Sequence, residues 1–230
     1  MRVPVGMVRG RYRFKPTPWS VALGYMLMSN QLTISGNILP PGVEVPEFKS
    51  KLAALEPSLL YDSRNNIFTP SSGIYAQVSA QLYSDAWGGD STFQLPKFVA
   101  YGYYPASDKV TLGLKVSGRS SHGDVPFYLL PYIKLRGVPA LRYQGDIAGE
   151  VEAEVRWQCW KRFSLVGFGG HGVARFDFGS NTETTSVNTY GLGFRYELAR
   201  GYGMHMGIDV AHGPEDTIVY FQFGSAWLAP

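Results

Sequence analysis

The sequence has one cysteine, few charged residues and no long apolar run, and each shortage excludes a class of protein. A single cysteine, Cys159, cannot form an internal disulfide or a cysteine-rich metal site. Charged residues make up 17% of the 230 residues, whereas disordered chains are rich in charge. The net charge is only +3 and the basic residues are scattered, so nucleic acid is not an expected partner. No stretch reaches the roughly 18 consecutive apolar residues of a transmembrane helix.

Glycine and aromatic residues are abundant instead. The chain contains 27 Gly, 15 Tyr and 13 Phe residues, which suit strands better than helices. The N-terminal stretch MRVPVGMVRGRYRF lacks the apolar core of a secretory signal peptide, so no signal peptide is predicted there. The composition therefore predicts an all-β protein.

Apolar and polar residues alternate along many segments, which is typical of strands with one apolar face. In the segment 73–83, Ile74, Val78 and Leu82 share an apolar face, while Gln77 lies on the polar one. The alternation predicts about eleven strands, at 3–14, 18–33, 51–63, 73–84, 93–105, 110–121, 146–160, 163–177, 187–199, 204–212 and 218–227. Many exceed the length of about 5–6 residues that is common in soluble proteins.

These long strands favour a single antiparallel transmembrane β-barrel domain over residues 1–230. Short turns interleave with longer loops at 34–50 and 122–145, as in outer-membrane barrels. Tryptophans near strand ends suit the membrane interfaces: Trp19, Trp87, Trp157, Trp160 and Trp227. The apolar face is expected to contact lipid at Ile74, Val78, Leu82, Leu192 and Leu198. A soluble β-sandwich or lipocalin-like barrel is the alternative, because its core face is also apolar.

Three motifs occur in a fixed order. YDSRNNIFTPSSGIYAQVSAQL (61–82) resembles the Asp-Thr-Arg-Asn/Asp-Asn…Pro…Gly segment of the BamA/TamA family, also called the bacterial surface antigen family. LRGVPALRYQGD followed by GEVEAEVRW resembles its Arg-Gly loop and glutamate strand, and IVYFQFGSAW resembles its C-terminal strand. The resemblance covers 51–227 and implies strands six to sixteen of a sixteen-stranded barrel, without POTRA domains. A shortened chain and a smaller barrel completed by self-association through open strand edges both fit this expectation.

The resemblance also implies that the loop containing Arg136 and Gly137 folds back into the barrel lumen. A guanidinium offers five donors in a planar fork and suits carboxylate pairing. Its expected partner is Glu154, with Glu152 and Glu150 as alternatives in the same row. Two positions depart from the family pattern: Gly170 replaces a second acidic partner, and Val138 replaces an aromatic residue. A weaker latch is therefore expected.

Asp62 and Arg64 form a second marked pair, close to Asn65 and Asn66. They are expected to belong either to a network at the lumen or barrel rim, or to an ordinary strand end with turn-forming asparagines.

Members of the family insert or translocate polypeptides at the bacterial outer membrane, through a weakly paired seam that can receive a client strand. The resemblance thus implies the lipid bilayer and client outer-membrane polypeptides as partners. A passive outer-membrane pore or structural barrel is the alternative. Three histidines precede aspartates, His122, His205 and His212, but no hydrolase or metal-binding motif accompanies them. A non-enzymatic protein without a cofactor or metal is therefore expected, and a barrel hydrolase is the third possibility.

Overall fold

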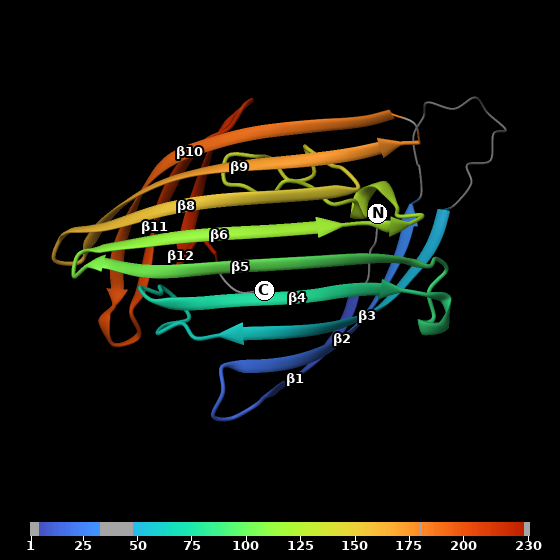
Figure 1. The fold of residues 1–230 in the computed structure, drawn as a ribbon, viewed down its shortest axis with the longest axis horizontal. Helices are drawn as coiled ribbons and strands as arrows, with labels where there is room; N and C mark the ends of the chain where they lie inside the picture. The colour runs from blue at the N-terminus through green and yellow to red at the C-terminus, as the bar shows by residue number, and fades with distance from the viewer. Residues whose placement is uncertain (1–4, 33–47, 180, 228–230) are drawn as a thin grey trace.

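The computed structural model describes residues 5–32, 48–179 and 181–227, which form one strongly curved antiparallel sheet (Figure 1). The strands are β1 (Val5–Arg13), β2 (Trp19–Leu32), β3 (Phe48–Asp62), β4 (Gly73–Tyr83), β5 (Phe93–Ser107), β6 (Val110–Ser120), β7 (His122–Gly123), β8 (Ile147–Trp160), β9 (Phe163–Phe178), β10 (Asn181–Ala199), β11 (Met204–His212) and β12 (Thr217–Phe223). Three short 3-10 helices lie at Asp85–Trp87, Phe127–Leu129 and Arg200–Tyr202. None of the helices in these ranges could span a membrane.

The long strands pair in the order in which they occur along the chain. β1 and β12 form the two edges, and within the described residues they do not pair with each other. The two-residue strand β7 lies off this path and pairs with β5. The prediction of an all-β fold with about eleven long antiparallel strands is thus confirmed. The expected loop at 34–50 lies almost wholly outside the described residues.

Two strands differ from the expectation. β10 begins at Asn181, six residues before the expected start at 187. The sequence showed no sign of this, because the first six residues of the strand are polar on both faces and show no alternation. β12 ends at Phe223 rather than at 227. Gly224 there has a φ of 82°, a left-handed conformation that ends the strand and turns the chain inward.

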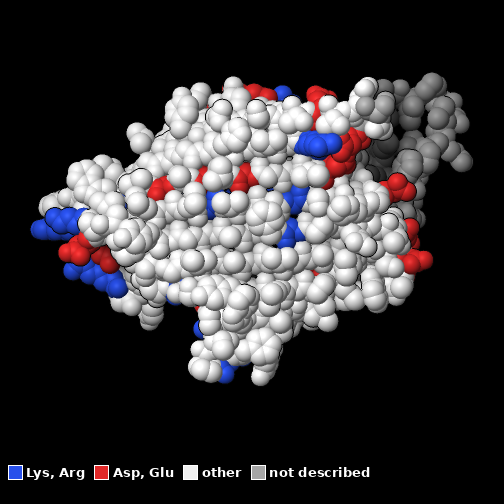
Figure 2. Space-filling view, in the orientation of Figure 1, with Lys and Arg blue, Asp and Glu red and all other residues white. Residues whose placement is uncertain are grey.

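The convex face is apolar, as the alternation predicts. Val78 is 61% exposed and Leu192 is 73% exposed on this face, where Ile74 and Leu198 also point outward and Leu82 is half-buried. Figure 2 shows this face as mostly uncharged, with some charged atoms visible between the strands near its middle and others gathered at its ends. A largely apolar outer face of this kind suits a lipid bilayer.

The concave face is instead lined by polar side chains that are buried. Glu150, Glu152 and Glu154 of β8 are 4%, 2% and 7% exposed, because the loop between β7 and β8 packs over them. Residues 224–227, which follow β12, fold onto the same face. Trp227 was expected at the membrane interface, but it is only 5% exposed and packs against Tyr101 and Tyr103 of β5. That expectation is wrong.

Candidate functional site on the concave face

The loop between β7 and β8 is seated on the inner wall by apolar contacts. Ile133 and Leu135 are 1% and 5% exposed and belong to a buried cluster with Val138. They lie over Gly170 and Gly172 of β9. A methyl group added at Gly170 would lie 2.8 Å from the Leu135 side chain, and one added at Gly172 would lie closer still to Ile133. The glycine at 170 therefore provides space for the loop, and an aspartate could not occupy this position without displacing it.

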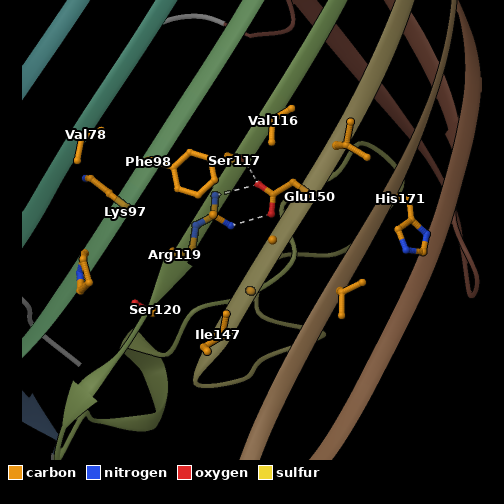
Figure 3. A pocket seen from close by; sticks show the side chains of 16 residues that line it. Val78, Lys97, Phe98, Val116, Ser117, Arg119, Ser120, Ile147, Glu150 and His171 are labelled. Carbon is orange, nitrogen blue, oxygen red and sulfur yellow. Dashed lines mark hydrogen bonds and ion pairs between the residues drawn. The ribbon is translucent and has the colours of Figure 1, made fainter.

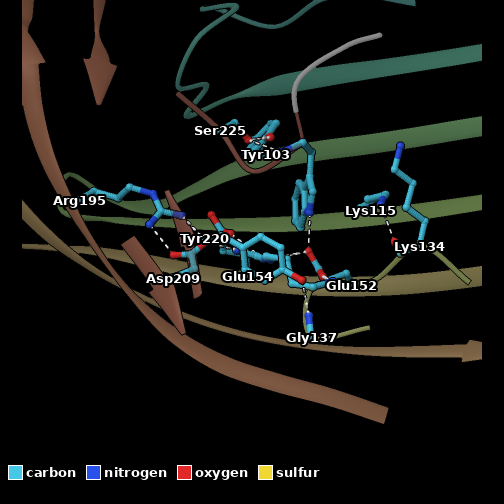
Figure 4. A network of polar contacts seen from close by, with 12 residues as sticks. Tyr103, Lys115, Lys134, Gly137, Glu152, Glu154, Arg195, Asp209, Tyr220 and Ser225 are labelled. Carbon is cyan, nitrogen blue, oxygen red and sulfur yellow. Dashed lines mark hydrogen bonds and ion pairs between the residues drawn. The ribbon is translucent and has the colours of Figure 1, made fainter. Parts of the chain in front are cut away.

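Arg136 extends from this loop into a group of three carboxylates, those of Glu152, Glu154 and Asp209, which Figure 4 labels. Its Nε donates to Glu152 Oε1 at 3.0 Å, and its main-chain N–H donates to Glu152 Oε2 at 3.3 Å. Nη2 lies 2.9 Å from Glu154 Oε2, an ion pair whose angles do not make a hydrogen bond. Nη1 donates to Asp209 Oδ2 of β11 at 2.9 Å. The guanidinium also lies over the Phe168 ring, 3.6 Å from its centroid.

This environment stabilises the charged form of Arg136. Burial alone lowers the pKa of a guanidinium, but Glu152, Glu154 and Asp209 outweigh that effect and raise the pKa of Arg136. Of the three glutamates proposed as partners, Arg136 contacts Glu152 and Glu154. Glu150 is bonded to Arg119 of β6 instead, at 2.9 Å.

Asp209 is the acidic partner that the sequence analysis did not identify. It is fully buried and also accepts a hydrogen bond from Arg195 Nη2 of β10 at 2.8 Å. The sequence does contain a sign of its role. Asp209 is the one acidic residue of β11 and alternates with Ile208 and Val210, which face outward, so its carboxylate has to face inward. The family pattern has its second acid on β9, where this chain has Gly170. Asp209 of β11 supplies a second acid here, and the expectation of a weaker latch loses its basis.

The loop tip also reaches the hairpin formed by β11 and β12. The main-chain N–H of Gly137 donates to the Tyr220 hydroxyl of β12 at 3.0 Å. Gly137 has a φ of 90°, and an added methyl group would lie 3.1 Å from the main chain of the β11–β12 turn. A glycine suits this position for two reasons: the left-handed conformation and the close approach to the turn.

Two further contacts join the loop to the same turn. Arg142 and Tyr143 both bond Glu215, at 2.8 Å each from the closest oxygen, on the exposed side of the loop. The hydrogen bond from Arg142 lowers the pKa of the Glu215 carboxyl. An exposed pair of this kind contributes little to stability. Arg136, by contrast, connects β8 to β11 in a buried site.

The chain end after β12 joins the same network. Trp227 Nε1 donates to Glu152 Oε1 at 2.6 Å, so that this oxygen serves both Trp227 and Arg136. The hydroxyl groups of Ser225 and Tyr103 are 2.7 Å apart. The Arg136 loop, β8, the terminal hairpin and the chain end are therefore held by one set of polar contacts.

Asp62 and Arg64 form a bidentate pair, with two hydrogen bonds of 2.8 Å. Burial lowers the pKa of Arg64, but the bonds to Asp62 outweigh this and the pKa is raised overall. Asn66 of the same turn donates to the main-chain oxygen of Tyr202 at 2.7 Å. The turn at 63–72 thus reaches the β10–β11 turn across the concave face, which favours the rim network over an ordinary strand end as the proposed role of this pair.

The histidines do not form catalytic pairs in the described residues. His205 contacts the main-chain oxygen of Gly203, and His212 contacts Thr217. The carboxylate of Asp209 is occupied by Arg136 and Arg195 instead.

Asp209→Asn should weaken the network while preserving its shape. The amide keeps one acceptor but removes the negative charge that both arginines share, so the free energy of unfolding should fall by about 1.5–3 kcal/mol. Denaturant titration of the folded protein in detergent measures this change. Asp216→Asn, in the exposed β11–β12 turn, is the matched control and should leave stability unchanged. Equal losses in the two variants would contradict a special role for Asp209.

Comparison with known proteins identifies two similarities. The Omp85 superfamily domain matches residues 6–134. The crystal structure of BamA from Haemophilus ducreyi lacking POTRA domains 1-3 has a similar fold, with a TM-score of 0.63 at 14% sequence identity over 90% of this chain. The chain spans about half the length of that BamA chain, 50% of which is covered. No curated protein matches the chain.

Proposed function

The chain belongs to the Omp85 superfamily, and on this premise we propose that it is an outer-membrane β-barrel protein that inserts or translocates client polypeptides. The BamA/TamA resemblance of the sequence is confirmed at this level, by the family domain and by the fold. Membrane residence is supported by the apolar band on the convex face. In this proposal the protein is not an enzyme, and residues 1–230 form a single barrel domain corresponding to strands six to sixteen of larger relatives.

The observation that carries the proposal is the outer edge of β12, which pairs with no other strand of the described residues and belongs to the hairpin that the Arg136 loop holds. An edge strand presents unpaired N–H and C=O groups, to which an extended client segment can add as a further strand. Tyr220 of β12 and Asp209 of β11 are both bonded to the loop tip. We propose that the loop acts as a latch that fixes the edge strand in the position that receives the client. A second copy of the chain could pair with the same edge.

Site-specific photocrosslinking tests the client proposal. A photoreactive amino acid replaces Phe221 of β12, which is 76% exposed beside the free edge. The matched control replaces Leu192 of β10, which is 73% exposed on the same convex face but lies in an interior strand. With the protein in liposomes and an unfolded outer-membrane protein added, crosslinks to the client should form at Phe221 and not at Leu192.

A passive pore is the second candidate, favoured by the polar side chains that line the concave face. Channel conductance in planar bilayers, together with no client crosslink at Phe221, would reject insertion and support the pore. Equal crosslinking at Phe221 and Leu192 would indicate nonspecific contact and would also reject the edge as the client site.

A further inference from the structure

The cavity of about 460 Å³ on the concave face has an unusual distribution of charge. It lies between β4, β5, β6 and the Arg136 loop, and its volume is within the range of about 300–1,000 Å³ that is common for small-ligand sites. Four basic residues line it: Lys97, Lys115, Arg119 and Lys134. No acidic residue in the described part of the chain lines it. A cavity of this kind favours a negatively charged occupant.

Two of the four cations already have carboxylate partners. Lys97 lies 3.2 Å from Glu56, and Arg119 lies 2.9 Å from Glu150 (Figure 3). The remaining polar contact of Arg119 is to the main-chain oxygen of Tyr132 at 2.6 Å. These two residues make the wall positive but have part of their charge compensated.

Lys115 and Lys134 are different, because neither forms an ion pair with a described carboxylate. Lys115 lies opposite Glu152 in the β6–β8 register, but its ammonium group donates to the main-chain oxygen of Lys134 at 3.4 Å. Glu152 is already bonded to Arg136 and Trp227. Figure 4 shows the two lysines next to each other at one side of the view. Two ammonium groups therefore share this side of the cavity without an ion pair to a described carboxylate, although Glu150 and Glu152 attract Lys115 from beyond ion-pair distance.

Uncharged donors complete the lining. The Ser79 hydroxyl is buried without a hydrogen-bond partner, and its residue is only 5% exposed. Gln77 accepts a hydrogen bond from Tyr75 through its amide oxygen, at 2.6 Å, which leaves its NH₂ group to donate. A buried hydroxyl without a partner is costly, so a ligand that accepts hydrogen bonds would remove an existing penalty.

We propose that this cavity is a binding site for a small oxyanion, held by Lys115 and Lys134 and by the hydroxyl and amide donors of β4. A phosphate or carboxylate group has several acceptor oxygens, which match ammonium and hydroxyl donors arranged around one point. Tyr101 and Trp227 form an apolar part of the wall, which suits the carbon skeleton of an organic anion. The site does not depend on client insertion, and it places a bound anion beside the chain end that contacts Glu152.

Calorimetric titration of the folded full chain in a zwitterionic detergent tests the site, with inorganic phosphate and succinate as separate probes and chloride as the background anion. Saturable binding of phosphate alone would assign a phosphate site, and binding of succinate a carboxylate site. No saturable binding of either probe, or equally strong competition by chloride, would overturn the proposal.

Lys115→Gln and Lys134→Gln should each weaken binding about tenfold, because each removes one charged hydrogen bond. Lys109→Gln makes the same change of charge in the exposed β5–β6 turn and should bind as the unaltered protein does. Lys134 is also exposed, so its replacement keeps the test valid if Lys115→Gln fails to fold. Unchanged affinity in both cavity variants, in protein that keeps its folded migration on unheated gels, would reject the site.

Discussion

Arg136→Ala should lower the free energy of unfolding by about 3–5 kcal/mol, because it leaves buried carboxylates without their cation. Glu152 and Asp209 are 2% and 0% exposed and would lose their bonds to Arg136. Trp227 still donates to Glu152, and Arg195 still pairs with Asp209, but Glu154 keeps no ion pair with another described residue. The expected loss lies toward the upper end of the range, since Asp209 replaces the acid that β9 lacks.

The same variant should expose the loop. In a nonspecific protease digest, cleavage within 131–145 should become fast in Arg136→Ala, because the remaining apolar contacts of Ile133 and Leu135 must hold the loop alone. Arg142→Ala is the matched control in the same loop. It removes an exposed bond to Glu215 that contributes little to stability, so the loop should stay resistant to the protease. A nonspecific protease keeps the comparison fair, since neither substitution removes its cleavage sites.

Arg136→Lys should restore only part of the lost stability. An ammonium group is a point charge, and it cannot place planar donors toward β8 and β11 at the same time. Full recovery with lysine would mean that charge alone is sufficient, and it would contradict the geometric role of the guanidinium. Identical protease sensitivity in Arg136→Ala and Arg142→Ala would contradict the latch itself.

The alternation of side chains made most strands predictable, because one face of most strands is apolar along nearly its whole length, the polar start of β10 being an exception. The pairing of Arg136 with β8 was expected from the family resemblance, which implied a loop folded back onto the inward-facing glutamates of the following strand. The bond to Asp209 spans 73 residues and depends on the curvature of the sheet, which no local pattern reports. The inward turn at Gly224 was missed for a similar reason, because Trp227 is apolar and fits a membrane interface as well as a buried site.

The role of the glycines in β9 also depends on neighbours that the sequence does not reveal. In the sequence, Gly170 marked the absence of an acid and suggested a weaker latch. In the structure, Gly170 and Gly172 leave room for Leu135 and Ile133, so the missing side chain is what allows the loop to pack against the wall. The function of a glycine as space can be recognised only when its neighbour is known.

Val78→Arg should lower the free energy of unfolding in a bilayer by about 2–4 kcal/mol, because it places a charge in the lipid-facing band. Val78 lies near the middle of β4 and is 61% exposed on the convex face. In aqueous solution such an exposed position would accept arginine with little change. Denaturant unfolding from liposomes measures the cost that belongs to the membrane.

The control must lie on the concave face of the same strand. Gln77 lies on that face, but it is only 3% exposed and bonded to Tyr75, so arginine there would disturb packing. Gln81 is better suited, since its amide donates to Glu56 at 2.9 Å and an arginine can replace that bond with a charged one. Gln81→Arg should therefore cost little in liposomes. A large cost for Val78→Arg with a small one for Gln81→Arg is the outcome that a membrane barrel requires. Equal costs would favour a soluble sheet, because in water the convex face has no reason to reject a charge.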